Sequence, residues 1–149
     1  MRLFDIELKT ETLHEQMQLI CRELKPNWPD QLDKLTIKHL SGGITNCLYV
    51  CHLNTNHWNH ADSLLFRIYG HNTEDFISRS DEVSTMSLMN EIGLGPKIHG
   101  QFKNGICYEL LAGEILTTTD VYNESIYTKV YFNFSETKFI YFQKISILI

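Results

Sequence analysis

Two adjacent glycines, Gly42 and Gly43, separate two segments of strand character, and this pair constrains the fold more than any other feature of the sequence. The segments cover residues 35–40 and 44–53. The turn of one serine and two glycines between them predicts that they pair as antiparallel strands. A polar loop follows at 54–63, and the apolar residues at 64–69 predict a third strand.

Helical patterns lie on either side of these three strands. Before them, Thr12 and Glu15 match a capping box, and Pro26 stops the helical pattern that follows. The apolar positions of that pattern are Leu13, Met17, Ile20 and Leu24. After the strands, residues of about 74–92 predict a second helix with Thr73 as its N-cap.

Two further strands complete the predicted sheet. Gly93-Leu-Gly-Pro96 ends the second helix, and residues 97–102 and 106–111 have strand character. Lys103-Asn-Gly105 between them is a strong hairpin signal. We therefore predict an α+β fold, with a small antiparallel sheet of about five strands, one crossing helix and an N-terminal helix.

Arg67 is the first candidate for a functional side chain. The strand period places it on one face with Leu65 and Tyr69, so it lies between two apolar neighbours. An arginine exposed to solvent is the simpler interpretation. The glycine turn upstream favours another, because backbone N–H groups at such a turn can approach a phosphate that a nearby cation neutralises. Glu82 on the second helix could orient this cation, although a surface glutamate is an equally open interpretation.

Asn46 could hold the glycine turn closed by a hydrogen bond across the loop, or be an ordinary turn residue. The cysteine and histidines of the neighbouring segment could suggest a metal site. Their spacing fits no compact zinc pattern. These residues are Cys51, His52, His57 and His60, and we expect them to bind no metal.

Composition argues against several classes of protein. The 149 residues hold 13 Lys and Arg against 18 Asp and Glu, a net charge of -5, and they contain no basic run, so nucleic acid is not an expected partner. No apolar run of 18 residues occurs, and charged residues interrupt the first twenty, so we expect a cytoplasmic protein with no membrane span. The four cysteines are then expected to be reduced.

Five segments together resemble the choline/ethanolamine kinase family over roughly residues 35–127. They are Gly42-Gly-Ile-Thr-Asn46, Phe66-Arg-Ile-Tyr-Gly70, Ser78-Arg-Ser-Asp-Glu82, Gly93-Leu-Gly-Pro-Lys97 and Asn104-Gly-Ile-Cys-Tyr-Glu-Leu-Leu-Ala-Gly113. The last of these is more similar to the ethanolamine branch than to the choline branch. The resemblance implies the N-terminal lobe of a protein-kinase-like fold, over residues 1–130.

The resemblance also implies a reaction and a set of site residues. The reaction is transfer of a phosphoryl group from Mg-ATP to the hydroxyl of ethanolamine, a step of phosphatidylethanolamine synthesis. Arg67 would replace the usual kinase lysine and Glu82 would orient it, while the backbone of Glu109 and Leu111 would meet adenine. The implied phosphate loop consists of Gly42, Gly43, Thr45 and Asn46.

Two motifs that the family has after the segment ending at Gly113 are missing from the sequence. The family's catalytic loop, of the form His-Asn-Asp followed by Asn, and its acidic metal-binding motif have no counterpart there. We therefore expect a truncated form with no catalytic and no metal-binding residue, and residues 131–149 to be a divergent aromatic tail. A nucleotide- or partner-binding module without catalysis, and another small-molecule kinase such as a choline kinase, are the alternatives. Ethanolamine is the expected small-molecule partner of a full-length form, and association into a homo-oligomer stays open.

Overall fold

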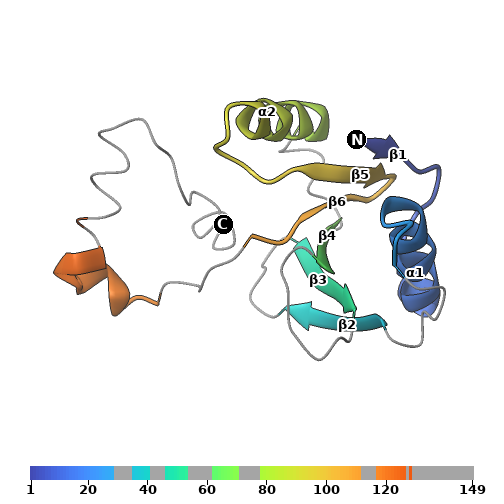
Figure 1. Cartoon of the computed structure of the whole chain (residues 1–149), viewed down its shortest axis with the longest axis horizontal. Helices are drawn as coiled ribbons and strands as arrows, with labels where there is room; N and C mark the ends of the chain where they lie inside the picture. Colours follow the sequence, from blue (N-terminus) through green and yellow to red (C-terminus); the bar gives the residue numbers. More distant parts are fainter. Residues whose placement is uncertain are drawn as a thin grey trace.

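A six-stranded sheet forms the centre of the computed structural model, which describes residues 1–28, 35–40, 46–53, 62–70, 78–111, 117–126 and 128. The strands lie in the order β1-β5-β6-β4-β3-β2 (Figure 1). Their bounds are β1 Arg2–Leu3, β2 Leu35–Leu40, β3 Asn46–Leu53, β4 Ser63–Tyr69, β5 Ile98–Phe102 and β6 Gly105–Glu109. The predicted α+β class is confirmed, and five of the strands pair antiparallel as expected.

The sixth strand, β1, is absent from the sequence-based prediction. It has two residues and pairs parallel with β5, with Arg2 opposite Gly100 and Leu3 opposite Gln101. The amide of Phe4 extends the pairing by donating to the Gln101 carbonyl at 2.8 Å. A strand of two residues has no period to recognise, so only its long-range partner defines it.

Helix α1, Leu13–Leu24, confirms the predicted N-terminal helix, but the predicted capping box is wrong. The side chain of Thr12 makes no cap hydrogen bond. A short 3₁₀ turn, η1 at Thr10–Thr12, leads directly into the helix, and the Thr12 amide donates to the Lys9 carbonyl at 3.1 Å. Gln16 makes the local side-chain contacts instead: its Oε1 accepts from the Lys9 amide at 2.8 Å and its Nε2 donates to the Glu7 carbonyl at 3.0 Å.

Helix α2, Arg79–Glu91, is the predicted crossing helix with a later start. Ser78 is the N-cap, and its hydroxyl accepts a hydrogen bond from the Asp81 amide at 3.4 Å. Thr73, the expected cap, lies outside the described residues. The helix ends at Glu91, and Gly93 stops it as predicted, because the φ of Gly93, 74°, lies in the left-handed region that favours glycine.

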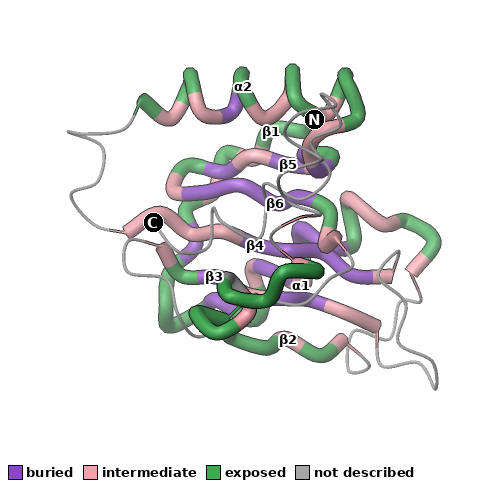
Figure 2. The backbone as a smooth tube through the Cα atoms, turned by 90° about the vertical axis from the view of Figure 1, so that its left-hand side faces the viewer, coloured by how far each residue is buried: buried purple, intermediate pink, exposed green. Residues whose placement is uncertain are grey.

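Two apolar clusters cover opposite faces of the sheet, and β4 supplies both. Leu64 and Phe66 pack with residues of α1, whereas Leu65 packs with Val83 of α2. This confirms the predicted alternation along β4. Figure 2 shows buried residues along the central strands, while most of α2 is exposed or intermediate.

The predicted hairpin between β5 and β6 is also confirmed, and its turn joins three parts of the fold. The side chain of Asn104 donates to the Leu8 carbonyl and accepts from the Leu8 amide, both at 2.9 Å. The Asn104 carbonyl accepts from the Tyr69 amide at 2.8 Å. These bonds fix the turn against the N-terminal segment and against the end of β4.

Beyond the sheet, a short 3₁₀ helix, η4, covers Asp120–Tyr122. No helix in the described ranges combines the length and the hydropathy that are needed to cross a membrane. The segment expected to diverge, 131–149, lies outside the described residues. The division of the chain at residue 130 therefore stays a prediction.

His99 on β5 predicts a dependence of stability on pH. Burial, followed by the nearby charges of Lys25 and Lys97, lowers the pKa of His99 below its ordinary value, against a smaller opposing effect of Glu109. Between the folded pKa and about 6.5, the ordinary value for histidine, the unfolded chain binds more protons than the folded one. The contribution of His99 to the free energy of unfolding is therefore fully present above about pH 6.5 and is lost as the pH drops toward the folded pKa.

We expect His99→Gln to reduce this loss on acidification. Melting temperatures at pH 7.5 and pH 5.5 measure the effect, and the same replacement at His14, which is exposed on α1, is the matched control. A pH-dependent loss that is identical in wild type and His99→Gln would contradict the assignment.

Candidate functional site

Arg67 lies near the centre of the sheet and is mostly buried. On β4 it is opposite Leu48 of β3 and opposite Ile106 of β6. Only 17% of its side chain is exposed. The interpretation of Arg67 as a solvated surface residue is therefore wrong, because a buried guanidinium needs an anionic or hydrogen-bonding partner.

Glu82 is this partner. It lies in the first turn of α2, and its Oε1 is 2.8 Å from Nη1 of Arg67. The expected pairing between the strand cation and a carboxylate of the crossing helix thus forms. The side chain of Glu82 is also 17% exposed, so Glu82 is not a surface residue of the helix.

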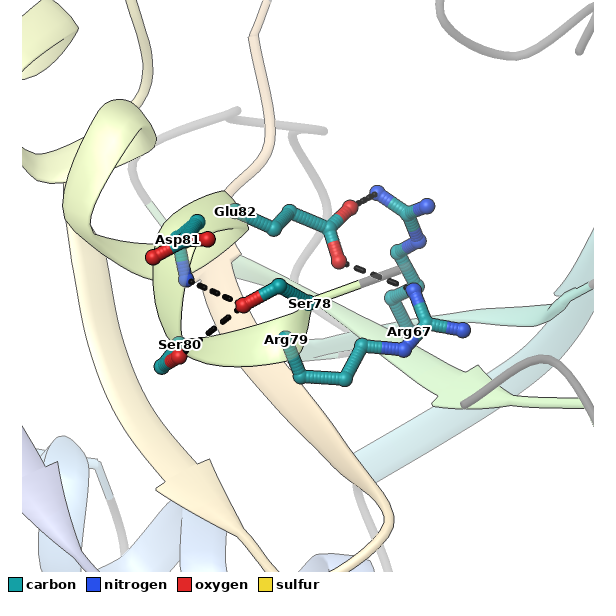
Figure 3. Close-up of polar contacts among 6 residues, drawn as sticks. All are labelled: Arg67, Ser78, Arg79, Ser80, Asp81 and Glu82. Atoms are coloured by element: carbon teal, nitrogen blue, oxygen red, sulfur yellow. Dashed lines mark hydrogen bonds and ion pairs between the residues drawn. The ribbon is translucent and has the colours of Figure 1, made fainter. Parts of the chain in front are cut away.

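A second arginine, Arg79, completes the cluster. Its Nη1 donates to Oε2 of Glu82 at 2.9 Å, so each carboxylate oxygen holds a different arginine (Figure 3). Its guanidinium also lies over the ring of Tyr69, 3.9 Å from the ring centre. Sequence reasoning missed Arg79, although its position three residues before Glu82 is a spacing at which helical side chains meet.

Tyr69 connects this cluster to the start of β3. It is opposite Asn46, which is the last residue of the predicted phosphate loop and the first residue of β3. Burial is the main cause that raises the pKa of Tyr69, and the charge of Glu82 adds to it. Its hydroxyl is buried, and within the described part of the chain it has no hydrogen-bond partner.

The remaining predicted site residues divide into two groups. Gly42, Gly43 and Thr45 lie outside the described residues, so the predicted phosphate loop is untested. Glu109 ends β6 opposite Leu64, which is three residues, or about 10 Å, along β4 from Arg67. Leu111 lies two residues after Glu109 and is half-buried.

Of the two residues expected to meet adenine, Glu109 already has hydrogen bonds to Lys97. The Glu109 amide donates to the Lys97 carbonyl at 2.9 Å, and the Glu109 carboxylate accepts from the Lys97 amide at 3.3 Å. The Glu109 amide is therefore not available to adenine. If Glu109 contacts adenine through its backbone, it does so through its carbonyl.

The charge of the cluster suits an anionic ligand. Arg67 and Arg79 carry two positive charges and Glu82 carries one negative charge, which leaves an excess of one positive charge in a largely buried place. Arginine stays charged when partly buried, and its planar fork matches phosphate oxygens. The cluster can therefore bind phosphate.

Magnesium fits this cluster poorly. The carboxylate of Glu82 is the only acidic group of the cluster, and both of its oxygens hold arginines. In the described ranges, no group of three or more His, Cys, Asp or Glu side chains could hold a metal ion. Any magnesium that accompanies a nucleotide here therefore needs ligands from other residues.

Known proteins of one family are similar to this chain in sequence and in fold. The sequence model of the family described as choline/ethanolamine kinase matches residues 37–144. The chain belongs to the choline/ethanolamine kinase family. It is 33% identical to ethanolamine kinase 1 of Homo sapiens over 124 residues, which cover 78% of this chain and 26% of the relative. A probable ethanolamine kinase of Nematostella vectensis is 32% identical over 116 residues, or 76% of this chain and 32% of the relative.

Solved structures of the family share the fold. A choline kinase of Cryptosporidium parvum superposes with a TM-score of 0.65 at 30% identity, over 78% of this chain and 32% of that chain. An ethanolamine kinase of Plasmodium vivax superposes with a TM-score of 0.60 at 23% identity, over 77% and 30% respectively. The chain thus spans about a quarter to a third of the length of these kinase relatives.

Proposed function

We propose that this chain is the nucleotide-binding lobe of an ethanolamine kinase and that Arg67 holds the phosphates of ATP. The observation that carries the proposal is the buried ion pair between Arg67 on β4 and Glu82 on α2, at 2.8 Å. In kinases, a strand cation that is paired with a carboxylate of the crossing helix contacts the phosphates of the nucleotide. Here an arginine takes the place of the usual lysine.

Each described residue has a distinct part in this proposal. Arg67 binds phosphate oxygens, and Glu82 keeps the guanidinium oriented toward them. The backbone carbonyl of Glu109 and the backbone of Leu111 would meet adenine at the end of β6. Magnesium, when bound with ATP, neutralises charge on the phosphates, and its ligands would lie outside the described cluster.

Ethanolamine is the proposed substrate because the curated relatives named above are ethanolamine kinases. The similarity to a solved choline kinase keeps choline as the second candidate. The two substrates differ only in the methyl groups on nitrogen. Competition between ethanolamine and choline, measured on a version of the protein that includes the catalytic segments, decides between them.

We expect Arg67→Ala to weaken the use of ATP far more than Lys97→Ala. Hydrogen bonds to a charged group contribute about 1.5–3 kcal/mol, so the loss of Arg67 should reduce kcat/KM for ATP by about ten- to a hundredfold. Lys97 is exposed, directly before β5, and is the matched control. Steady-state kinetics with varied ATP, on a version that includes the catalytic segments, measures both variants.

Equal losses in the two variants, or no loss for Arg67→Ala, would remove Arg67 from the site. A binding module without catalysis is the competing function. Such a module would bind ATP through Arg67 but would form no product even with the catalytic segments present.

A further inference from the structure

Glu82 divides its carboxylate between two arginines, and this division determines what Arg67 can still bind. Oε1 contacts Arg67 at 2.8 Å and Oε2 contacts Arg79 at 2.9 Å. Carboxylate and arginine commonly form a bidentate pair, in which both oxygens bind one guanidinium. Because Arg79 holds Oε2, Glu82 contacts Arg67 through a single oxygen (Figure 3).

This one-point contact matters because a guanidinium has a limited number of donors. A bidentate pair with Glu82 would take two of the five N–H groups of Arg67 and one side of its fork. Within the described residues, Glu82 is the only ion-pair partner of Arg67. The single contact therefore fixes the orientation of Arg67 and leaves more of its fork for a phosphate.

Arg79 is itself well positioned to hold the second oxygen. Its side chain is 13% exposed, and its guanidinium lies 3.9 Å from the centre of the Tyr69 ring. The stack on Tyr69 is a cation–π contact, which is stronger when water is excluded. Arg79 also belongs to the first turn of α2, which Ser78 caps, so its backbone is fixed to the same helix as Glu82.

Arg79 also changes the charge of the site. Arg67 and Glu82 alone form a neutral pair, which attracts an anion weakly. With Arg79 the cluster has an excess of one positive charge, in a place where the three side chains are 13–17% exposed. Both effects of Arg79 favour the binding of a phosphate by Arg67.

We propose that Arg79 is a positioning residue of the phosphate site: it holds Oε2 of Glu82 so that Arg67 remains open to a nucleotide phosphate. This inference rests on the proposed function. Arg79 acts on the nucleotide through Glu82 and Arg67 and makes no contact with the phosphate itself. Removing Arg79 should let Glu82 pair with Arg67 through both oxygens and should leave the cluster neutral.

The test uses the 149-residue chain, with ADP as the probe. Binding is followed by ¹⁵N NMR of the arginine side chains, which detects weak ligands. We expect Arg79→Met to weaken ADP binding by about tenfold, the equivalent of about one ion-pair contact. In the free protein, the same substitution should protect both Nη groups of Arg67 from hydrogen exchange with water. Arg79→Lys, which keeps the charge but lacks the fork, should lie between Arg79→Met and wild type. Arg22→Met, at an exposed position of α1, should bind ADP as wild type does.

A double-mutant cycle separates positioning from direct contact. In a Glu82→Gln background the carboxylate that Arg79 holds is removed, so Arg79→Met should then change ADP affinity by less than about threefold, which is the part that the lost positive charge alone supplies. A full tenfold loss in that background would overturn the proposal, because Arg79 would then contact ADP directly. Melting curves identify variants that fail to fold, and Arg79→Lys decides the question if Arg79→Met unfolds.

The remaining outcomes distinguish this inference from the proposed function. If wild type binds ADP through Arg67 and Arg79→Met binds it equally well, only the role of Arg79 is overturned. If ADP perturbs neither Arg67 nor Arg79 in the wild-type chain, the phosphate site itself is wrong, and the role of Arg79 is overturned with it.

Discussion

The 149-residue chain, purified and supplied with ATP, magnesium and ethanolamine, is expected to form no phosphoethanolamine at a useful rate. No residue after Gly113 matches the catalytic loop or the metal-binding motif that the family resemblance implies. A positioned general base contributes about 10²–10⁴-fold to a rate. Metal ions that neutralise the phosphates contribute further, and the cluster around Glu82 has no oxygen to offer them. A phosphate site alone cannot compensate for both losses.

A radiolabel-transfer assay with the purified chain measures this directly. Ethanolamine kinase 1 of Homo sapiens, to which the chain is 33% identical, is a suitable positive control. Turnover within tenfold of that control would contradict the prediction. It would mean that a catalytic aspartate had been missed, with Asp75, Asp81 and Asp120 as the first candidates, or that a partner chain supplies the second lobe.

Gly105→Ala is expected to destabilise the sheet by about 3 kcal/mol or more, which lowers the melting temperature by about 10 °C. Gly105 begins β6 and lies opposite Ile68 of β4 and Phe102 of β5. A Cβ atom there would lie 2.5 Å from one ring carbon of Phe102, and it would also clash with the backbone carbonyl oxygen of Arg67. Backbone cannot rotate away as a side chain can, so the strands must separate at Arg67.

Gly93→Ala is the matched control for this effect. Gly93 has a φ of 74°, but a Cβ atom there would meet nothing within 4 Å. Its replacement should cost about 1–2 kcal/mol, the strain of a left-handed residue with a side chain. Thermal and urea unfolding measure both variants. A Gly105→Ala protein as stable as Gly93→Ala would show that the close approach of β4 and β6 at Arg67 does not constrain the fold.

The sequence predicted the main elements of the sheet well because their signals are local. The alternation along residues 64–69 correctly placed Arg67 with Leu65 and Tyr69, since side chains of a strand alternate with a fixed period. Gly93 and the Lys103-Asn-Gly105 turn gave the correct helix end and hairpin for the same reason. The sequence signals for helix starts were less reliable. The Thr12 side chain makes no cap hydrogen bond, and Ser78 rather than Thr73 is the N-cap of α2. Several residues near each start could act as the N-cap, so the sequence does not select one of them.

The candidate site shows the same division between local and long-range information. From the sequence, residue types and the spacing of Gly42, Gly43, Arg67 and Glu82 pointed to a phosphate site. Whether Arg67 was exposed or buried, and whether Glu82 reached it, depended on how α2 lies against β4. A pattern of residues contains no information about that distance, so both alternatives stayed open until the 2.8 Å ion pair was seen.

By itself, the sequence determined the class of fold, the faces of β4 and the family to which the chain belongs. Only the tertiary structure decided that β1 joins the sheet beside β5 and that Arg79 shares Glu82 with Arg67 while stacking on Tyr69. The physical reason is that periodicity and turn chemistry act between neighbours in the chain. Pairing of β1 with β5 and stacking of Arg79 on Tyr69 depend on packing between elements that are distant in sequence.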